Sequence, residues 1–253
     1  MKHVDYDKVA PVYDRRYSTD HLAGVEECLL AWTRQVETHH VLEVGCGTGH
    51  WLTALKDCEL RCGLDFSSGM LHKARQKDDS LPLVQGTAVR LPFSSNAFDL
   101  VFCINAIHHF PDPAIFIWEA HRILKKDGLL AIIGMDPQTE PDRWYLYKYF
   151  PGTYETDRAR YPSGEMIQRW MKEAGFLSSE RQSVVHIDHD FVGREVLDDP
   201  ILQKNGTSQL ALLTDEAFQE GMARIKEVLQ MAEQHGEKII FPSHIALPTV
   251  VGY

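Results

Sequence analysis

The sequence has 253 residues, of which 44% are hydrophobic and 25% charged, with a formal net charge of -10 at neutral pH. These values are typical of a globular protein with a real core and exclude a disordered chain. The acidic balance disfavours nucleic acid as a partner, and no apolar run approaches the roughly 20 residues of a membrane span. We therefore expect neither a nucleic-acid partner nor a membrane partner.

The cysteines and the N-terminal residues indicate the cellular compartment expected for the chain. Five cysteines stand at irregular spacings with no Cys-x-x-Cys pair, and residues 1–18 lack the apolar core of a signal peptide. We therefore expect reduced thiols in a cytoplasmic protein. Three histidine pairs lack a third ligand at metal-binding spacing, so no metal site is expected.

Short apolar strands alternate with helical segments in the first half of the chain. The expected elements are strands at residues 41–44, 60–65, 83–86, 98–104 and 129–134, and helices at residues 50–56, 67–76 and 113–124. Ser67 is the expected N-cap of its helix. Such alternation predicts a doubly wound, mostly parallel α/β sheet.

The regular alternation ends after Met135. The remaining segments are a proline-rich and aromatic stretch at 136–162, a helix at 163–174, a strand at 183–191, a mostly helical region at 193–236 and a last strand at 239–253. Ser163 and Thr214 are expected as N-caps, and Gly175 as the end of a helix.

Residues 41–49 form the most specific motif. Glu43 precedes three glycines at alternate positions, Gly45, Gly47 and Gly49, after a strand and before a helix. Glycines at the carboxyl end of a first strand allow a tight turn and close approach of a ligand to the backbone. The Gly-x-Gly-x-Gly spacing differs from the Gly-x-Gly-x-x-Gly of nicotinamide-binding proteins, so an oxidoreductase is disfavoured.

Asp65 ends the second strand, where a carboxylate can accept hydrogen bonds from both ribose hydroxyls of a nucleoside. The alternatives are a solvated turn aspartate or a helix N-cap.

Four blocks in order resemble the class I S-adenosylmethionine-dependent methyltransferases, in particular the ubiquinone- and menaquinone-biosynthesis-like group called methyltransferase type 11. The blocks are residues 43–49, 63–71, 86–93 and 98–113. A looser match covers residues 123–130, residues 6–14 resemble the group's N-terminal helix, and from about residue 137 only the architecture matches.

This resemblance implies a Rossmann-like fold with a mostly parallel seven-stranded sheet, its last strand antiparallel, plus a helical and aromatic cap. We expect a single domain over residues 1–253, with cap insertions at about 137–162 and 193–236. The implied activity is direct in-line transfer of a methyl group from S-adenosylmethionine to a small-molecule acceptor, which leaves S-adenosylhomocysteine. A monomer or a homodimer is expected.

The resemblance also implies residue roles. The expected cofactor-binding residues are Glu43, Gly45, Cys46, Gly47, Gly49, Asp65, Phe66, Met70, Thr87, Ala88, Val89, Asn105 and Ala106. Phe66 and Met70 are expected to flank the adenine, and Asn105 and Ala106 to lie near the methionine portion. The group often has aspartate where this chain has Thr87, and a hydroxyl accepts a hydrogen bond from the adenine amino group more weakly than a carboxylate does.

Methyl transfer needs alignment and exclusion of water, and it needs a base only when the nucleophile arrives protonated. His108 is the favoured candidate base and its neighbour His109 the less favoured one, and Tyr13 is a further candidate that covers the cofactor or faces the substrate. Loop packing is the alternative for His108 and its neighbour His109, and core packing is the alternative for Tyr13.

The aromatic segment after residue 137 is expected to form the acceptor site. The candidate substrate-binding residues are Tyr13, Trp144, Tyr147, Arg158 and Arg160. The arginines could pair with a substrate carboxylate, or face solvent while the aromatics pack inward.

Other functions stay open at this point. They are a non-catalytic S-adenosylmethionine-binding regulatory or scaffold protein, an enzyme with other chemistry on the same cofactor, and a methyltransferase of nucleic acid or protein. The acceptor, and whether oxygen, nitrogen, carbon or sulfur is methylated, are also open.

Overall fold

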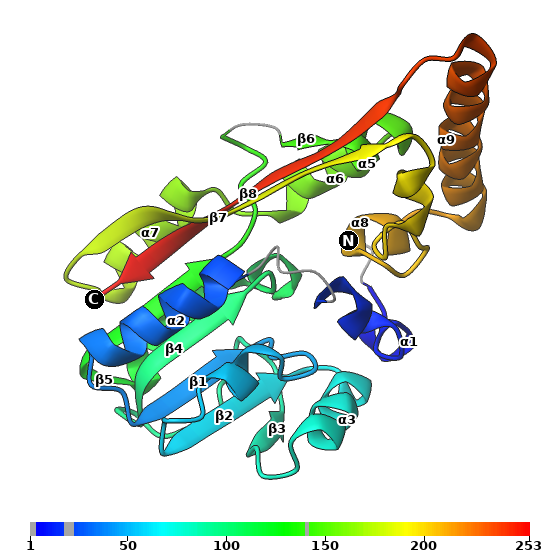
Figure 1. Cartoon of the computed structure of the whole chain (residues 1–253). Helices are drawn as coiled ribbons and strands as arrows, with labels where there is room; N and C mark the ends of the chain where they lie inside the picture. The colour runs from blue at the N-terminus through cyan, green and yellow to red at the C-terminus, as the bar shows by residue number, and fades with distance from the viewer. Residues whose placement is uncertain (1–3, 18–22, 140–141) are drawn as a thin grey trace.

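The computed structural model describes residues 4–17, 23–139 and 142–253, and Figure 1 shows its arrangement. Eight described strands form one sheet in the order β3-β2-β1-β4-β5-β8-β6, with β7 paired to β8. Their bounds are β1 His40–Val44, β2 Leu60–Asp65, β3 Leu83–Gln85, β4 Phe98–Ile104, β5 Leu124–Ile133, β6 Arg143–Trp144, β7 Ser179–Val192 and β8 Ile240–Gly252.

The sheet is mostly parallel, as expected from the sequence. Strands β1 to β5 pair in parallel, whereas β8 pairs antiparallel with β5, β6 and β7. The sheet has one strand more than expected, because the two residues of β6 pair with Ser243 and His244 of β8. The doubly wound, Rossmann-like fold is confirmed.

Strand alternation sends side chains to two separate apolar layers. Helices α2 (Ala23–Gln35) and α3 (Ser68–Lys77) cover one face, and α4 (Pro113–Ile123) and α7 (Gly164–Ala174) cover the other. Val41, Leu100 and Phe102 pack with α2, whereas Leu42, Val101 and Cys103 pack with α4 and α7. The central strands β1 and β4 are thus covered on both sides, which explains their largely apolar sequences.

Helix ends follow the capping residues of the sequence. Ser67, Ser163 and Thr214 are N-caps whose side chains accept hydrogen bonds from backbone N–H groups of the first turn, and Gly175 ends α7 in a left-handed conformation. These expectations are confirmed, because a cap depends on residues within one helical turn.

The helix expected at residues 50–56 is only a 3₁₀ turn, η3 (Trp51–Ala54). After Ala54 the chain makes a further turn, in which the Cys58 N–H donates to the Leu55 carbonyl, and β2 begins at Leu60.

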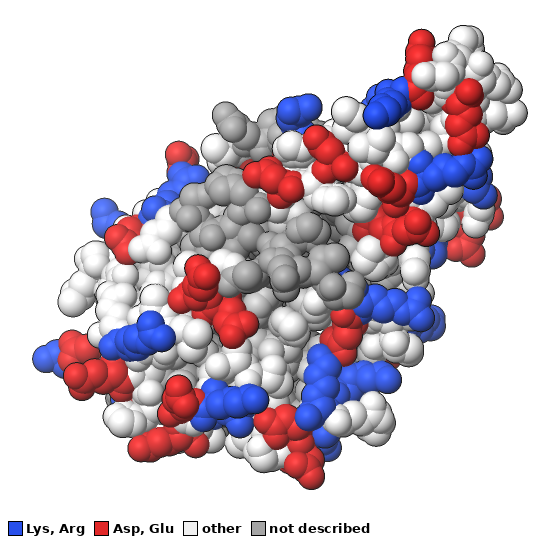
Figure 2. Space-filling view, viewed as in Figure 1, with Lys and Arg blue, Asp and Glu red and all other residues white. Residues whose placement is uncertain are grey.

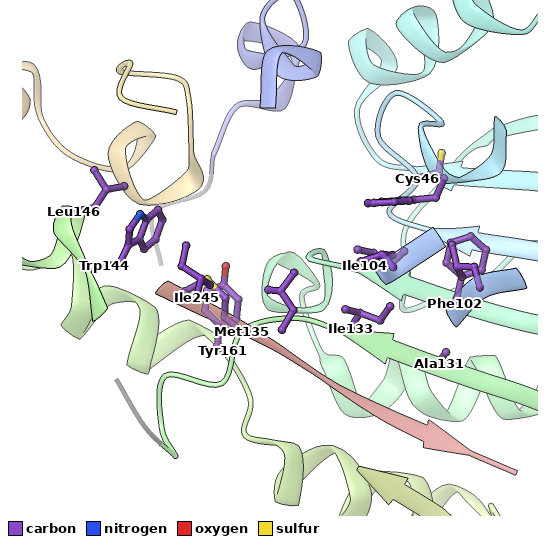
Figure 3. Packing of buried hydrophobic residues seen from close by; sticks show 14 of the residues in the cluster. Cys46, Phe102, Ile104, Ala131, Ile133, Met135, Trp144, Leu146, Tyr161 and Ile245 are labelled. Carbon is purple, nitrogen blue, oxygen red and sulfur yellow. The ribbon is translucent and has the colours of Figure 1, made fainter. Parts of the chain in front are cut away.

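The ends of β7 and β8 extend beyond the other strands and carry a helical cap (Figure 1). The cap helices are α5 (Tyr145–Tyr149), α6 (Thr153–Arg160), η5 (Gly193–Asp198), α8 (Ser208–Ala211) and α9 (Asp215–His235). One apolar cluster continues from Ile133 and Met135 through Tyr161 and Ile245 to Trp144 (Figure 3). Within the described residues, no helix has the length and apolar character needed to cross a membrane.

Candidate active site

The glycine loop follows β1 and turns back over the end of β2. Gly45 and Gly47 have φ angles of +78° and +52°, a region that side chains rarely adopt. A Cβ atom on Gly45 would lie 2.5 Å from the Cβ of Ala106, so the loop after β4 approaches the backbone too closely for any other residue. A Cβ atom on Gly47 would lie 3.8 Å from the Tyr13 ring, in ordinary van der Waals contact.

Asp65 lies at the end of β2, and two backbone amides orient its carboxylate. The Gly47 N–H donates to Oδ2 and the Ser67 N–H donates to Oδ1, each at 2.8 Å. Burial raises the pKa of Asp65, and the amide hydrogen bonds oppose that rise. Glu43, buried behind the loop, has its pKa raised well above the usual range by burial and by Asp65.

A cleft of about 520 Å³ opens beside this loop, and we call it the loop cleft. Its lining includes these expected cofactor residues: Gly45, Gly47, Asp65, Phe66, Met70, Thr87, Ala88, Asn105 and Ala106. Phe66 is 79% exposed in this cleft. Its large aromatic ring offers a flat apolar surface that a planar ligand would cover. The volume falls within the ordinary range for small-molecule sites.

Four expected cofactor residues are not among those that line the loop cleft. They are Glu43, Cys46, Gly49 and Val89. A Cβ atom on Gly49 would meet Ala74 of α3 at 3.3 Å, so this glycine serves the packing of the loop against the helix.

The N-terminal segment covers the loop cleft, and helix α1 (Tyr6–Val9) is fixed to α3 through one carboxylate. Asp7 Oδ1 accepts hydrogen bonds from the Ser67 hydroxyl at 2.6 Å and from the Gly69 N–H at 2.8 Å. The following 3₁₀ helix, η1 (Tyr13–Tyr17), is fixed by Asp14, whose Oδ1 accepts from Thr48 and from Lys77.

A second cavity of about 260 Å³ lies under the cap, and we call it the cap cavity. Tyr13, His108 and Trp144, all expected from the sequence to serve substrate or chemistry, line it. His108 is 9% exposed and stacks on Tyr161 with ring centroids 3.7 Å apart. Neither ring nitrogen of His108 nor the indole nitrogen of Trp144 has a hydrogen-bond partner within the described residues.

The three other expected substrate residues are not among those that line either cavity. The Tyr147 hydroxyl donates to Asp157 at 2.9 Å, and Arg160 forms an ion pair with the same carboxylate at 2.7 Å. Arg158 is exposed, with its guanidinium 5.9 Å from the Tyr154 ring. Asp157 is fully buried and therefore requires partners inside the cap.

The two cavities share four lining residues, namely Tyr6, Tyr13, Asn105 and His109. Tyr6 is joined to His109 by a hydrogen bond of 2.6 Å between the hydroxyl and Nε2. Sequence reasoning missed Tyr6 as a site residue, although it opens the N-terminal block 6–14. Among the described residues, no cluster of three or more potential ligands could hold a metal ion.

Comparison with known proteins agrees with this geometry. The family described as a methyltransferase domain matches residues 42–132. Demethylmenaquinone methyltransferase of Lactiplantibacillus plantarum is 34% identical in an alignment of 169 positions that covers 58% of this chain and 69% of that protein. The same enzyme of Staphylococcus epidermidis is 30% identical in an alignment of 151 positions that covers 56% of this chain and 63% of that protein.

Solved structures show the same fold. A putative methyltransferase from an antibiotic biosynthesis pathway of Anabaena variabilis has a TM-score of 0.66 at 20% identity, over 85% of this chain and 90% of that one. Haemonchus contortus phospholethanolamine N-methyltransferase 2, solved with phosphomonomethylethanolamine and S-adenosylhomocysteine, has a TM-score of 0.57 at 20% identity. That likeness covers 97% of this chain and 57% of the other.

The fold and the loop cleft define a class I methyltransferase that depends on S-adenosylmethionine. More particularly, the chain belongs to the methyltransferase family that includes the demethylmenaquinone methyltransferases.

Proposed function

We propose that the chain transfers a methyl group to a small, largely apolar acceptor held in the cap cavity, while the cofactor occupies the loop cleft. The observation that carries this proposal is the meeting of the two cavities at Tyr6, Tyr13, Asn105 and His109. A donor in one cavity and an acceptor in the other would face each other there, as in-line displacement requires.

The lining of the loop cleft supports a nucleoside-bearing cofactor. Asp65 would hold the ribose hydroxyls, and the exposed ring of Phe66 would lie against the adenine together with Met70. Thr87 and Ala88 would contact the adenine edge, and the backbone at Gly45 and Gly47 would face the methionine portion. When bound, S-adenosylmethionine supplies a methyl group already activated by its positively charged sulfur.

The chemistry of the cap cavity narrows the acceptor. Its walls are mostly aromatic and aliphatic, including Met135, Trp144 and Phe191. The Trp144 N–H needs an acceptor and His108 needs a polar partner, because buried polar groups without hydrogen bonds are costly. A flat, uncharged ring that bears oxygen substituents satisfies both groups.

The state of His108 supports an acceptor without negative charge. Burial lowers the pKa of His108 well below its usual range, and His109 and Arg160 lower it further. His108 is therefore neutral at neutral pH and can recognise a hydroxyl or carbonyl. The same lowering makes His108 a weak proton acceptor, so we propose acceptor recognition for it in place of the expected role of base.

The names of the relatives provide the first acceptor to test, which is demethylmenaquinone in its reduced, dihydroxy form. We expect transfer of radiolabel from methyl-labelled S-adenosylmethionine to this compound. His108→Asn should raise the KM for the acceptor about tenfold while leaving affinity for S-adenosylhomocysteine unchanged, since one buried hydrogen bond contributes about 1 kcal/mol. His72→Asn, on the exposed face of α3, is the matched control.

If reduced demethylmenaquinone and simpler hydroxylated rings both remain unlabelled, while an aliphatic or anionic acceptor is methylated, this assignment of the acceptor is wrong.

A further inference from the structure

Tyr6 and His109 are hydrogen-bonded to each other at the point where the two cavities meet. We propose that Tyr6 is a catalytic residue and that it passes the proton of the acceptor hydroxyl to His109. This inference rests on the proposed function, because it requires a hydroxyl-bearing acceptor in the cap cavity.

Position is the first observation in its support. Tyr6 and His109 each line both the loop cleft and the cap cavity, whereas His108 lines the cap cavity alone. The methyl group must cross from one cavity to the other beside these two side chains. A proton released at the reacting oxygen, or at an oxygen conjugated with a reacting carbon, is therefore released next to them.

The geometry of the pair is the second observation. The Tyr6 hydroxyl lies 2.6 Å from His109 Nε2, and the two rings are nearly perpendicular with centroids 5.0 Å apart. Burial raises the pKa of Tyr6, so its hydroxyl keeps its proton. The relay uses the His109 tautomer in which Nε2 accepts a hydrogen bond from this hydroxyl. The phenolic oxygen retains lone pairs that can accept a hydrogen bond from the acceptor hydroxyl.

The proton transfer balances without any further reactant. The O–H bond of the acceptor breaks, its proton moves to the Tyr6 oxygen, and the electron pair stays on the acceptor as the nucleophile. The original Tyr6 proton moves at the same time to His109 Nε2, which becomes imidazolium. Tyr6 thus ends neutral, and His109 carries the positive charge until it releases a proton to solvent.

Several charged and titratable groups surround the pair. Tyr13 and Arg16 of η1, Asp65 at the end of β2 and Arg160 of α6 all act electrostatically on Tyr6. His108 of η4 (Ile107–His109) lies against His109, with ring centroids 3.9 Å apart. The guanidinium of Arg16 lies 3.7 Å from the centre of the Tyr13 ring. These groups stay in place in the variants below, so a changed pH profile reports the pair itself.

The segment that carries Tyr6 links this chemistry to cofactor binding. Tyr6 is next to Asp7, which is hydrogen-bonded to Ser67 and Gly69 beside the Asp65 end of the loop cleft. The relay is therefore assembled only while α1 covers the cleft. A proton is taken only when the site is closed, which excludes bulk water from the reacting atoms.

The test compares the wild-type chain with Tyr6→Phe, His109→Asn and the control Tyr253→Phe, whose hydroxyl contacts Glu180. Single-turnover methylation of reduced demethylmenaquinone is measured across pH, and affinity for S-adenosylhomocysteine is measured by calorimetry. Nuclear magnetic resonance of ¹⁵N-labelled histidines supplies a readout without turnover. In it, Tyr6→Phe should shift the His109 Nε2 signal, because the hydrogen bond is lost.

We expect Tyr6→Phe and His109→Asn each to slow the single turnover by about 100-fold or more, the usual range for general base catalysis. Cofactor affinity should stay within about threefold of wild type, a change under 1 kcal/mol. The wild-type rate should rise with pH, because His109 must be neutral to accept the proton, and that rise should vanish in His109→Asn.

Wild-type rates and an unchanged pH profile in both variants would overturn the relay while leaving the proposed function intact. An unshifted His109 signal in Tyr6→Phe would equally overturn it. Failure of the wild-type chain to methylate any hydroxylated ring would instead overturn the proposed function, and the relay with it.

Discussion

Asp65 is held in a fixed orientation before any ligand arrives. The Gly47 and Ser67 amides each occupy one lone-pair direction of a carboxylate oxygen, and each oxygen keeps another direction for a ribose hydroxyl. The left-handed backbone of Gly47, which glycine adopts without strain, directs its N–H toward Asp65. Preorganisation of this kind reduces the entropy lost on binding.

Replacement of Asp65 by alanine should weaken binding of S-adenosylhomocysteine by about 10- to 100-fold, because charged hydrogen bonds contribute about 1.5–3 kcal/mol. The measurement is calorimetric titration, with circular dichroism to establish that the fold persists. Asp57→Ala, in the exposed loop before β2, is the control and should bind normally. Equal affinities for the two variants would contradict the placement of the ribose.

The residues that could be predicted from sequence are those whose role is local. The glycine loop and Asp65 are adjacent to strand ends that hydrophobic patterning reveals. Tyr6 and His109 are 103 positions apart, and neither has a local signature of their hydrogen bond. Tyr147 and Arg160 were expected to meet the substrate because nothing local showed that buried Asp157 would bind both.

At the scale of elements, α1 lies close against the N-terminus of α3. A Cβ atom on Gly69 would lie 2.9 Å from Asp7 Oδ1. Any larger residue at position 69 would therefore push α1 away from α3. The Ser67 hydroxyl and the Gly69 amide lower the pKa of Asp7. A carboxylate whose folded pKa is lowered stabilises the docked segment above its ordinary pKa.

This contact should therefore weaken as pH falls through the lowered pKa of Asp7. Asp7→Asn should weaken it at neutral pH, because an amide accepts hydrogen bonds less strongly than a carboxylate. We expect faster hydrogen exchange at the Gly69 amide and faster dissociation of S-adenosylhomocysteine. Asp79→Asn, in the exposed turn after α3, should change neither. Identical exchange in both variants would show that Asp7 does not fix the segment.

The cap elements α6 and α8 are joined by one buried carboxylate. Asp157 accepts hydrogen bonds from Tyr147, Gln209 and Arg160, and the side chain of Arg160 is itself 6% exposed. Removal of one partner of a buried pair leaves an uncompensated charge.

Asp157→Ala should lower the free energy of unfolding by about 3–5 kcal/mol, the range found when a buried ion pair is broken. Chemical denaturation measures this change. Glu155→Ala, on the exposed side of the same helix, should have little effect. A loss as small as that of the control would mean that Asp157 does not join the cap elements.

At the scale of the whole molecule, fold class and layers could be predicted because strand and helix periodicities repeat along the chain. For the cap, only its helical and aromatic character could be predicted. Its contacts could not, because they join segments far apart in sequence, such as Trp144 and Ile245 in the cluster of Figure 3. On the face seen in Figure 2, Lys and Arg side chains are interspersed with Asp and Glu. This mixed surface agrees with a small-molecule acceptor.

The most direct test of the account is a crystal structure of the chain with S-adenosylhomocysteine. We expect the ribose hydroxyls to contact Asp65 and the adenine to lie against Phe66. We expect the sulfur to face Tyr6 and His109, where the two cavities meet. A ligand bound outside the loop cleft, or with its sulfur turned away from the cap cavity, would contradict it.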